Sequence, residues 1–147
     1  MNARDFLNVA YELLEGNHEA HWRTAVSRAY YAAFHAARDL LVQCGFTVPR
    51  EERAHTHLRM RLMNSGHPDV AQAGTWLNDL RSDRNYADYD FEGALKHADA
   101  VEAVQAADDA IQLLEEAAAL PTVCQRITEA MRIYERDVLR DVTWRAP

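Results

Sequence analysis

The chain has 147 residues, of which 48% are hydrophobic and 27% charged, and its net charge is −7. This length is sufficient for one domain with a hydrophobic core, and no apolar run approaches the ~20 residues that a membrane span needs. The negative charge excludes a polyanion-binding surface that covers the whole chain, although the acidic excess lies mainly in residues 92–147.

The first predicted helix covers about residues 3–15. Asp5, Glu12 and Glu15 interrupt its apolar pattern. A secretory signal would have an uninterrupted apolar stretch and a cleavage site with small residues. We therefore expect a cytoplasmic protein.

The second predicted helix, about residues 19–44, carries apolar rows on two sides and a polar row between them. The main apolar row advances by four and three residues alternately, and three alanines at its centre require close approach of a partner helix. The polar row has the same spacing and consists of Thr24, Arg28, Tyr31, His35 and Arg38. Two apolar faces are more than one small core needs, so we expect a central helix and a homodimer.

The third predicted helix covers about residues 52–64 and begins with Glu52-x-x-His55. Glu15-x-x-His18 has the same spacing, which is typical of di-iron carboxylate bundles. That spacing serves a metal only within a continuous helix. Gly16 interrupts the first motif and the second directly follows a loop. We therefore expect no metal and no cofactor.

The fourth predicted helix, about residues 68–88, ends in the stretch RSDRNYADYD. Within it, Arg81, Arg84 and Asp88 fall at positions i, i+3 and i+7, which lie on one face of a helix. One interpretation is a solvated helix end with an ion pair. The other is a phosphate-binding site, in which the two guanidinium groups contact phosphate oxygens and the carboxylate orients them.

Four further residues belong to the second interpretation. Tyr86 and Tyr89 would stack on a nucleobase. Arg28 and His35 would line the same groove if the second and fourth helices are neighbours.

Two more helices are predicted over about residues 94–119 and 122–140, separated by Pro121. Strand-like alternation is absent from the sequence. Long helices with short loops predict an all-α fold, an antiparallel bundle of four to six helices that forms one domain over residues 1–147.

Hydrolytic and nucleotide-hydrolysing enzymes find little support in the sequence. It contains no nucleophile elbow, Walker A loop or dinucleotide-binding glycine motif. Cys44 and Cys124 lie far apart without a C-x-x-C pattern, so we expect buried thiols and neither a disulfide nor a zinc site.

Two segments together resemble the HEPN family. They are SRAYYAAFHAARDLL at residues 27–41 and LRSDRNYADYDF at residues 80–91. The second is similar to the branch whose motif ends in Arg-x-x-Ala-Asp-Tyr, here Arg84 to Tyr89. The resemblance extends over about residues 1–119 and places the C-terminal helix, within residues 121–147, outside the family core.

This resemblance implies a small antiparallel helical bundle with a degenerate ribonuclease motif. Active members carry an Arg followed, after four to six residues, by a His, and they cleave RNA without a metal. The Arg neutralises the scissile phosphate while the imidazole moves the proton of the 2′-hydroxyl. After Arg84 the corresponding positions hold Tyr89, Asp90 and Phe91, and none is a histidine.

The resemblance therefore implies an RNA- or nucleotide-binding protein that binds better than it cuts, as a component of a toxin–antitoxin or defence system. One alternative is a non-catalytic interaction module that pairs with a nucleotidyltransferase-type protein. Another is a metal-independent ribonuclease in which His35 replaces the missing histidine.

Overall fold

The computed structural model describes residues 1–146, and all the regular secondary structure in this range is helical. This confirms the predicted all-α class. The α-helices are α1 (Ala3–Leu13), α2 (Glu19–Gln43), α3 (Arg53–Met63), α4 (Pro68–Tyr89), α5 (His97–Ala119) and α6 (Pro121–Tyr134), and a π-helical turn, η1 (Glu135–Leu139), follows α6. The last predicted helix is thus divided into an α-helical and a π-helical part.

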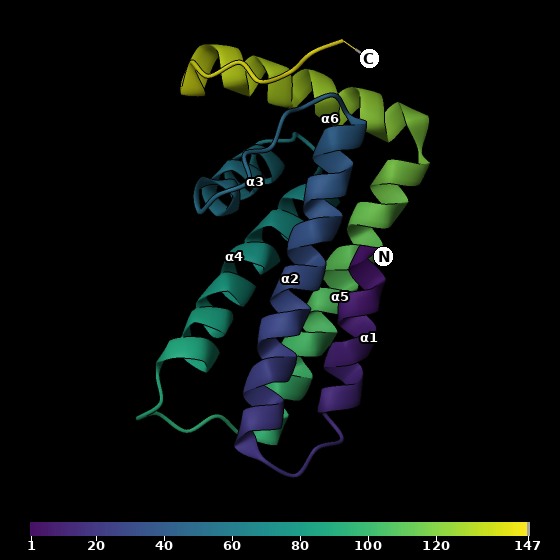
Figure 1. Cartoon of the computed structure of the whole chain (residues 1–147). Coiled ribbons are helices and arrows are strands. Elements are labelled where there is room, and N and C mark those ends of the chain that lie inside the picture. Colours follow the sequence, from purple (N-terminus) through teal and green to yellow (C-terminus); the bar gives the residue numbers. More distant parts are fainter. Residues whose placement is uncertain (147) are drawn as a thin grey trace.

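Helix α2 is the centre of the bundle, as its apolar rows predicted. It packs against α1, α4 and α5, and Figure 1 shows α1 and α4 running antiparallel to it while α5 runs in the same direction. Its contact surface is rich in buried small residues: Ala25, Ala29, Ala32, Ala33, Ala36 and Ala37. These side chains let the helix axes approach closely, and the apolar rows are covered by neighbours within one chain.

The end of α4 is held by an arginine that the sequence did not single out. Arg23 of α2 is buried and donates hydrogen bonds from Nη1 to the carbonyl oxygens of Tyr86 (3.1 Å), Ala87 (3.0 Å) and Asp90 (2.8 Å). Its Nε donates to Glu19 Oε1 at 3.2 Å, which fixes the orientation of the guanidinium group. The last carbonyls of a helix have no partner within the helix, so this arginine acts as the C-terminal cap of α4.

Helix α6 and the segment after it lie across one end of the bundle (Figure 1). The π-helical turn directs Glu135 into the interior, where it is fully buried and accepts hydrogen bonds from Arg61 Nε (2.7 Å) and the backbone N–H groups of Thr143 (2.9 Å) and Trp144 (3.2 Å). Burial alone would raise the pKa of this carboxyl, but the hydrogen bonds from Thr143 and Arg61 lower it below its ordinary value. The C-terminal segment is therefore anchored to α3 by a buried ion pair.

Residues 1–146 contain neither a membrane-spanning helix nor a cluster of metal ligands. None of the helices in this range has the length and hydrophobicity that crossing a membrane requires. In the same range, no group of three or more His, Cys, Asp or Glu residues is arranged to hold a metal ion.

Candidate functional site

Three arginines of the described chain are buried, and they differ in how their N–H groups are satisfied. Arg23 is 9% exposed, Arg61 2% and Arg84 6%. Arg23 caps α4, and Arg61 binds Glu135. Arg84 has neither kind of partner: its Nε is buried without an acceptor, and its ion pair with Asp88 spans 4.0 Å from Nη1 to Oδ2.

Aromatic rings surround the guanidinium group of Arg84. Its Cζ lies 5.5 Å from the ring centroid of Tyr30, 5.4 Å from that of Tyr31 and 6.0 Å from that of Tyr89. Such cation–π contacts stabilise the charge through the ring faces, but they provide no oxygen for the N–H donors. Those donors remain suited to an anion that accepts two hydrogen bonds from a planar guanidinium group, such as phosphate.

Arg81 lies one turn before Arg84 on the same side of α4. Its Nη2 donates to Glu52 Oε1 at 3.3 Å, while its Nε is buried without an acceptor. The Glu52 side chain is 81% exposed, so this ion pair is weakened by solvent and contributes little to stability. A second guanidinium group is therefore available beside the first.

His55 of α3 joins these arginines, although its sequence pattern suggested only a metal ligand. Its Nδ1 is hydrogen-bonded to the hydroxyl of Tyr30, and the two rings stack with centroids 5.5 Å apart. Burial lowers the pKa of His55, and the positive charges of Arg81 and Arg84 lower it further. The imidazole is therefore neutral near neutral pH. We call Arg84, Arg81, His55, Tyr30 and Tyr31 the Arg84 cluster.

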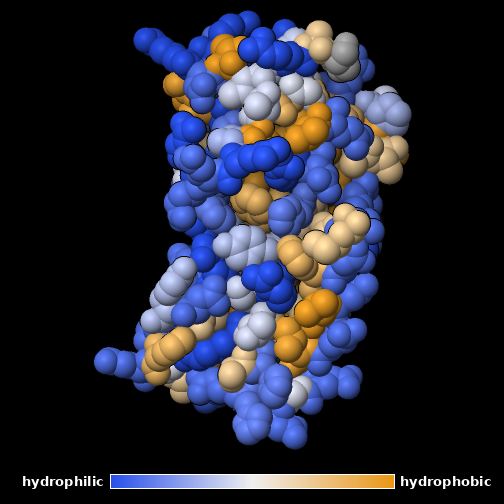
Figure 2. All heavy atoms as spheres, viewed as in Figure 1, coloured by the Kyte–Doolittle hydropathy of each residue, from blue (hydrophilic) through white to orange (hydrophobic). Residues whose placement is uncertain are grey.

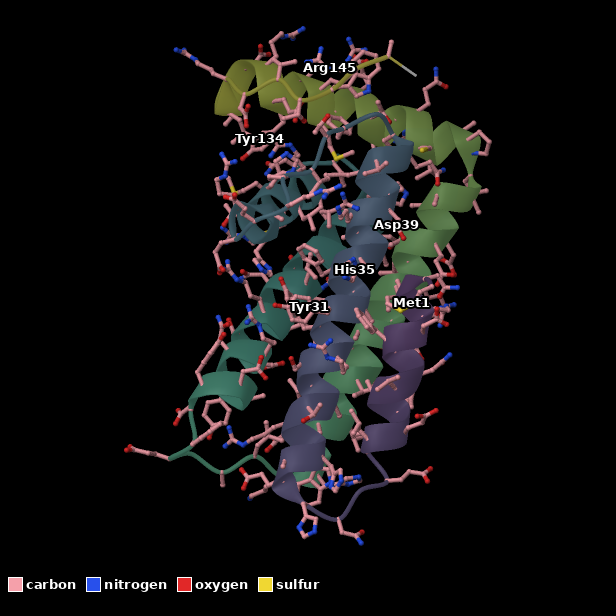
Figure 3. All side chains as sticks on the ribbon, in the orientation of Figure 1. Met1, Tyr31, His35, Asp39, Tyr134 and Arg145 are labelled. Carbon is pink, nitrogen blue, oxygen red and sulfur yellow. The ribbon has the colours of Figure 1, made fainter. Side chains whose placement is uncertain are left out.

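Arg28 contacts Tyr31, and His35 contacts the neighbouring Phe34. The Arg28 guanidinium lies 5.2 Å from the Tyr31 centroid, so Arg28 and Arg84 share this ring. Figure 3 shows Tyr31 and His35 following one another along the same side of α2. His35 packs against Phe6 and Phe34, and burial lowers its pKa. The structure thus places Arg28 beside the Arg84 cluster and His35 farther along α2.

Asp88 and Tyr89 border the Arg84 cluster at the end of α4. Asp88 Oδ2 accepts a hydrogen bond from Ser27 Oγ at 3.1 Å. The Tyr89 ring is 75% exposed and contacts Arg84, so one of its faces is open to a base. Tyr86 lies elsewhere, because its hydroxyl donates to the Ala94 carbonyl at 2.9 Å. The Tyr86 ring centroid lies 5.6 Å from Arg23 Cζ, and the structure does not bring it to Arg81 or Arg84.

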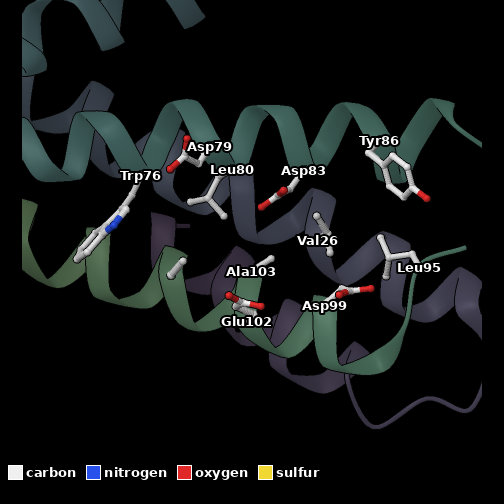
Figure 4. A pocket seen from close by; sticks show the side chains of 11 residues that line it. Val26, Trp76, Asp79, Leu80, Asp83, Tyr86, Leu95, Asp99, Glu102 and Ala103 are labelled. Carbon is white, nitrogen blue, oxygen red and sulfur yellow. The ribbon is translucent and has the colours of Figure 1, made fainter. Parts of the chain in front are cut away.

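Tyr86 instead lines a groove of about 450 Å³ between α4 and α5. Figure 4 shows this groove with its four carboxylates, Asp79, Asp83, Asp99 and Glu102. Burial raises the pKa of Asp83, and the neighbouring carboxylates raise it further. Negative charge repels phosphate, so this groove is unfavourable for an anion, whereas the Arg84 cluster carries the positive charge of two guanidinium groups.

On the face drawn in Figure 2, hydrophilic residues predominate and the hydrophobic patches are scattered.

The histidine of the cluster comes from α3, and a signal for it was present in the Glu52-x-x-His55 motif, since both side chains point to the cluster. Glu52 binds Arg81 and His55 binds Tyr30.

The protein is a helical bundle in which arginines and tyrosines gather between the second and fourth helices. The family model of the HEPN domain matches residues 1–119. The chain therefore belongs to the HEPN family, whose domains often have ribonuclease or nucleotide-related roles. No curated protein and no solved structure matches the chain.

Proposed function

We propose that this HEPN protein binds RNA or a nucleotide through a phosphate group at the Arg84 cluster. The observation that carries the proposal is the buried Arg84 guanidinium, whose Nε has no acceptor. A buried charge without hydrogen-bonding partners is costly, and a phosphate oxygen would supply the missing acceptors. Asp88 would orient the guanidinium group from its distance of 4.0 Å.

The neighbouring groups would extend the contact beyond one phosphate. Arg81 would bind a second phosphate oxygen by exchanging its solvent-exposed partner, Glu52. Arg28, whose guanidinium group also contacts the Tyr31 ring, would contact an adjacent phosphate. Tyr89 would stack on a base, as exposed aromatic side chains do in proteins that bind single-stranded nucleic acids.

The experiment is an anisotropy titration of a labelled, mixed-sequence single-stranded RNA, with ATP as a second probe. We compare the wild type with Arg84→Met, and with Arg4→Met as a control for the same loss of charge. Arg4 binds Glu115 and Asp108 away from the cluster. We expect binding at least about ten-fold weaker in Arg84→Met, within about two-fold of the wild type in Arg4→Met, and weaker for all proteins as salt rises. Equal binding by all three proteins, or none by the wild type, would contradict the proposal.

Metal-independent RNA cleavage is the second candidate function, with His55 as the base in place of His35. The observation that favours it is the position of His55 beside Arg81 and Arg84, whereas Phe34 lies between His55 and His35. A neutral imidazole next to a bound phosphate is suited to accept the proton of the 2′-hydroxyl.

We would measure cleavage of single-stranded RNA in the presence of EDTA. His55→Gln should reduce the rate about 100-fold, and His35→Gln should leave it within about three-fold of the wild type. Tyr89→Phe should also leave it almost unchanged. A wild-type protein without activity, or a larger loss in His35→Gln, would rule out this second function.

For the assembly we propose a homodimer and a role in a toxin–antitoxin or defence system with a nucleotidyltransferase-type partner. Membership of the HEPN family supports the homodimer, since HEPN domains often dimerise. Sedimentation at tens of micromolar should show a dimer, and the protein should co-purify with the product of an adjacent nucleotidyltransferase-type gene. A monomer that captures no such product would contradict this assignment.

A further inference from the structure

The two cysteines of the chain meet at the end of the bundle where α6 crosses α2. Cys44 follows the last turn of α2, Cys124 belongs to the first turns of α6, and 80 positions separate them in sequence. Their Sγ atoms are 3.1 Å apart. Both are free thiols, as the sequence suggested, but the fold brings these two residues into contact.

The two thiols differ in accessibility. Cys44 is buried, and burial raises the pKa of its thiol to about 12. Cys124 is partly exposed, and the side chain of Gln43 approaches it, with Nε2 3.9 Å from Sγ. An oxidant in solution therefore reaches Cys124 first. Cys44 lies in contact with it as a protonated thiol.

We propose that Cys44 and Cys124 are a modification site, at which a peroxide forms a reversible intramolecular disulfide. In the first step the Cys124 sulfur is oxidised to a sulfenic acid, and hydrogen peroxide is reduced to one water molecule. In the second step the Cys44 sulfur attacks the Cys124 sulfur. The S–O bond breaks, the S–S bond forms, and the hydroxyl group leaves with the Cys44 proton as a second water molecule.

The geometry requires only a small movement. A disulfide has an S–S distance of about 2.05 Å, so the sulfur atoms must approach by roughly 1 Å. Side-chain rotation and a slight shift of the first turn of α6 are sufficient for a movement of this size. The surrounding segment is held in place, since Trp144 Nε1 donates to the Cys44 carbonyl at 2.9 Å and Arg145 N donates to the Gly45 carbonyl at 2.9 Å.

A bond at this position would fix α6 to the end of α2. The covalent link would close a long loop of the chain, which restricts the unfolded state and raises stability. Because α6 leads directly into the turn that carries Glu135, the disulfide would also hold the C-terminal segment on the bundle. A thiol–disulfide pair of this kind responds to the redox state of its surroundings.

The test uses the full chain, reduced with dithiothreitol and then treated with hydrogen peroxide. We expect the intact mass to fall by two hydrogen atoms, a peptide that links residues 44 and 124, and a melting temperature that is higher by about 5–10 °C. Renewed treatment with dithiothreitol should reverse all three changes. Cys44→Ser should form no such link and should show no rise in melting temperature with peroxide.

Three results would overturn the proposal: a wild-type chain that gains oxygen at Cys124 without a crosslink, one that forms a disulfide only between two chains, or one that peroxide leaves unchanged. Each of them is read on the wild-type protein, so the test does not depend on whether the serine variant folds. RNA binding plays no part in these measurements.

Discussion

Two buried arginines, Arg61 of α3 and Arg84 of α4, show how a structural charge differs from a functional one. Arg61 Nε donates to Glu135 Oε2 at 2.7 Å, and Arg61 Nη2 lies 3.6 Å from Asp141 Oδ2. Arg84 has tyrosine rings around it and a carboxylate no closer than 4.0 Å in its ion pair. The first charge is neutralised within the chain, and the second leaves N–H donors for an anion from outside.

The largest expected effect comes from breaking the complete pair. Glu135→Ala leaves the Arg61 charge buried without its partner, so the free energy of unfolding should fall by about 3–5 kcal/mol. Urea unfolding measures this loss. Asp137→Ala, which removes a carboxylate exposed to solvent, is the control and should leave stability almost unchanged. Equal effects of the two substitutions would show that the Arg61 region is not what anchors the C-terminal segment.

The same region predicts a dependence of stability on pH. The pKa of His57 is lowered to about 4, chiefly by burial and also by the charge of Arg61, while Glu135 and Asp141 act in the opposite direction. The unfolded chain therefore binds a proton at higher pH than the folded chain does. The contribution is complete above pH 6.5 and is lost as the pH falls from 6.5 to 4, to a total of up to about 3 kcal/mol.

Urea unfolding of the wild type and His57→Leu at pH 7 and pH 5 tests this dependence. The wild type should lose more stability than the variant between the two values. If the wild type loses no more stability than His57→Leu between pH 7 and pH 5, the folded chain accepts a protonated His57 beside Arg61 and Glu135, and the prediction is wrong.

Arg23→Ala should have a smaller effect on stability. Its guanidinium group donates to several carbonyls at the end of α4, and charged hydrogen bonds contribute about 1.5–3 kcal/mol. We expect the free energy of unfolding in urea to fall by about 2 kcal/mol. The amides in the last turn of α4 should exchange hydrogen faster. If this turn exchanges as slowly in the variant as in the wild type, the capping role is wrong.

The helices were largely predictable, and the reasons are local. Glycine and proline positions end the periodic segments, and alternating steps of four and three residues identified α2 as the central helix. The common face of Arg81, Arg84 and Asp88 follows from helical spacing alone. These features depend on residues close in sequence, where backbone geometry is fixed.

The contacts between residues far apart in sequence depend on which helices pack together. A single sequence does not specify this packing. His55 reaches the arginines because α3 packs against α4, and Arg23 finds its carbonyls because α2 packs against the end of α4. The contact of Cys44 with Cys124 has the same origin. Tyr86 and Tyr89 are three positions apart, yet only Tyr89 contacts Arg84, because Tyr86 turns toward the groove beside α5.

That difference between the tyrosines gives the smallest prediction. Tyr89→Ala should weaken binding of single-stranded RNA by about 1 kcal/mol, because it removes one stacking face. Tyr86→Ala is the matched control from the same helix and should leave the affinity unchanged. An anisotropy titration measures both affinities. A larger loss of affinity in the Tyr86 variant would contradict the prediction, because it would place the base in the groove beside α5.

The most direct test of the central claim is the stability of Arg84→Met with and without single-stranded RNA. Without RNA, the variant should unfold within about 1 kcal/mol of the wild type, because the removed charge has no hydrogen-bonding partner in the chain. With RNA at about 100 times the wild-type dissociation constant, the wild type should gain about 2.7 kcal/mol and the variant no more than about 1.4 kcal/mol. A variant that loses 3 kcal/mol or more without RNA, beside a wild type that gains nothing with it, would show that Arg84 is a structural arginine like Arg61.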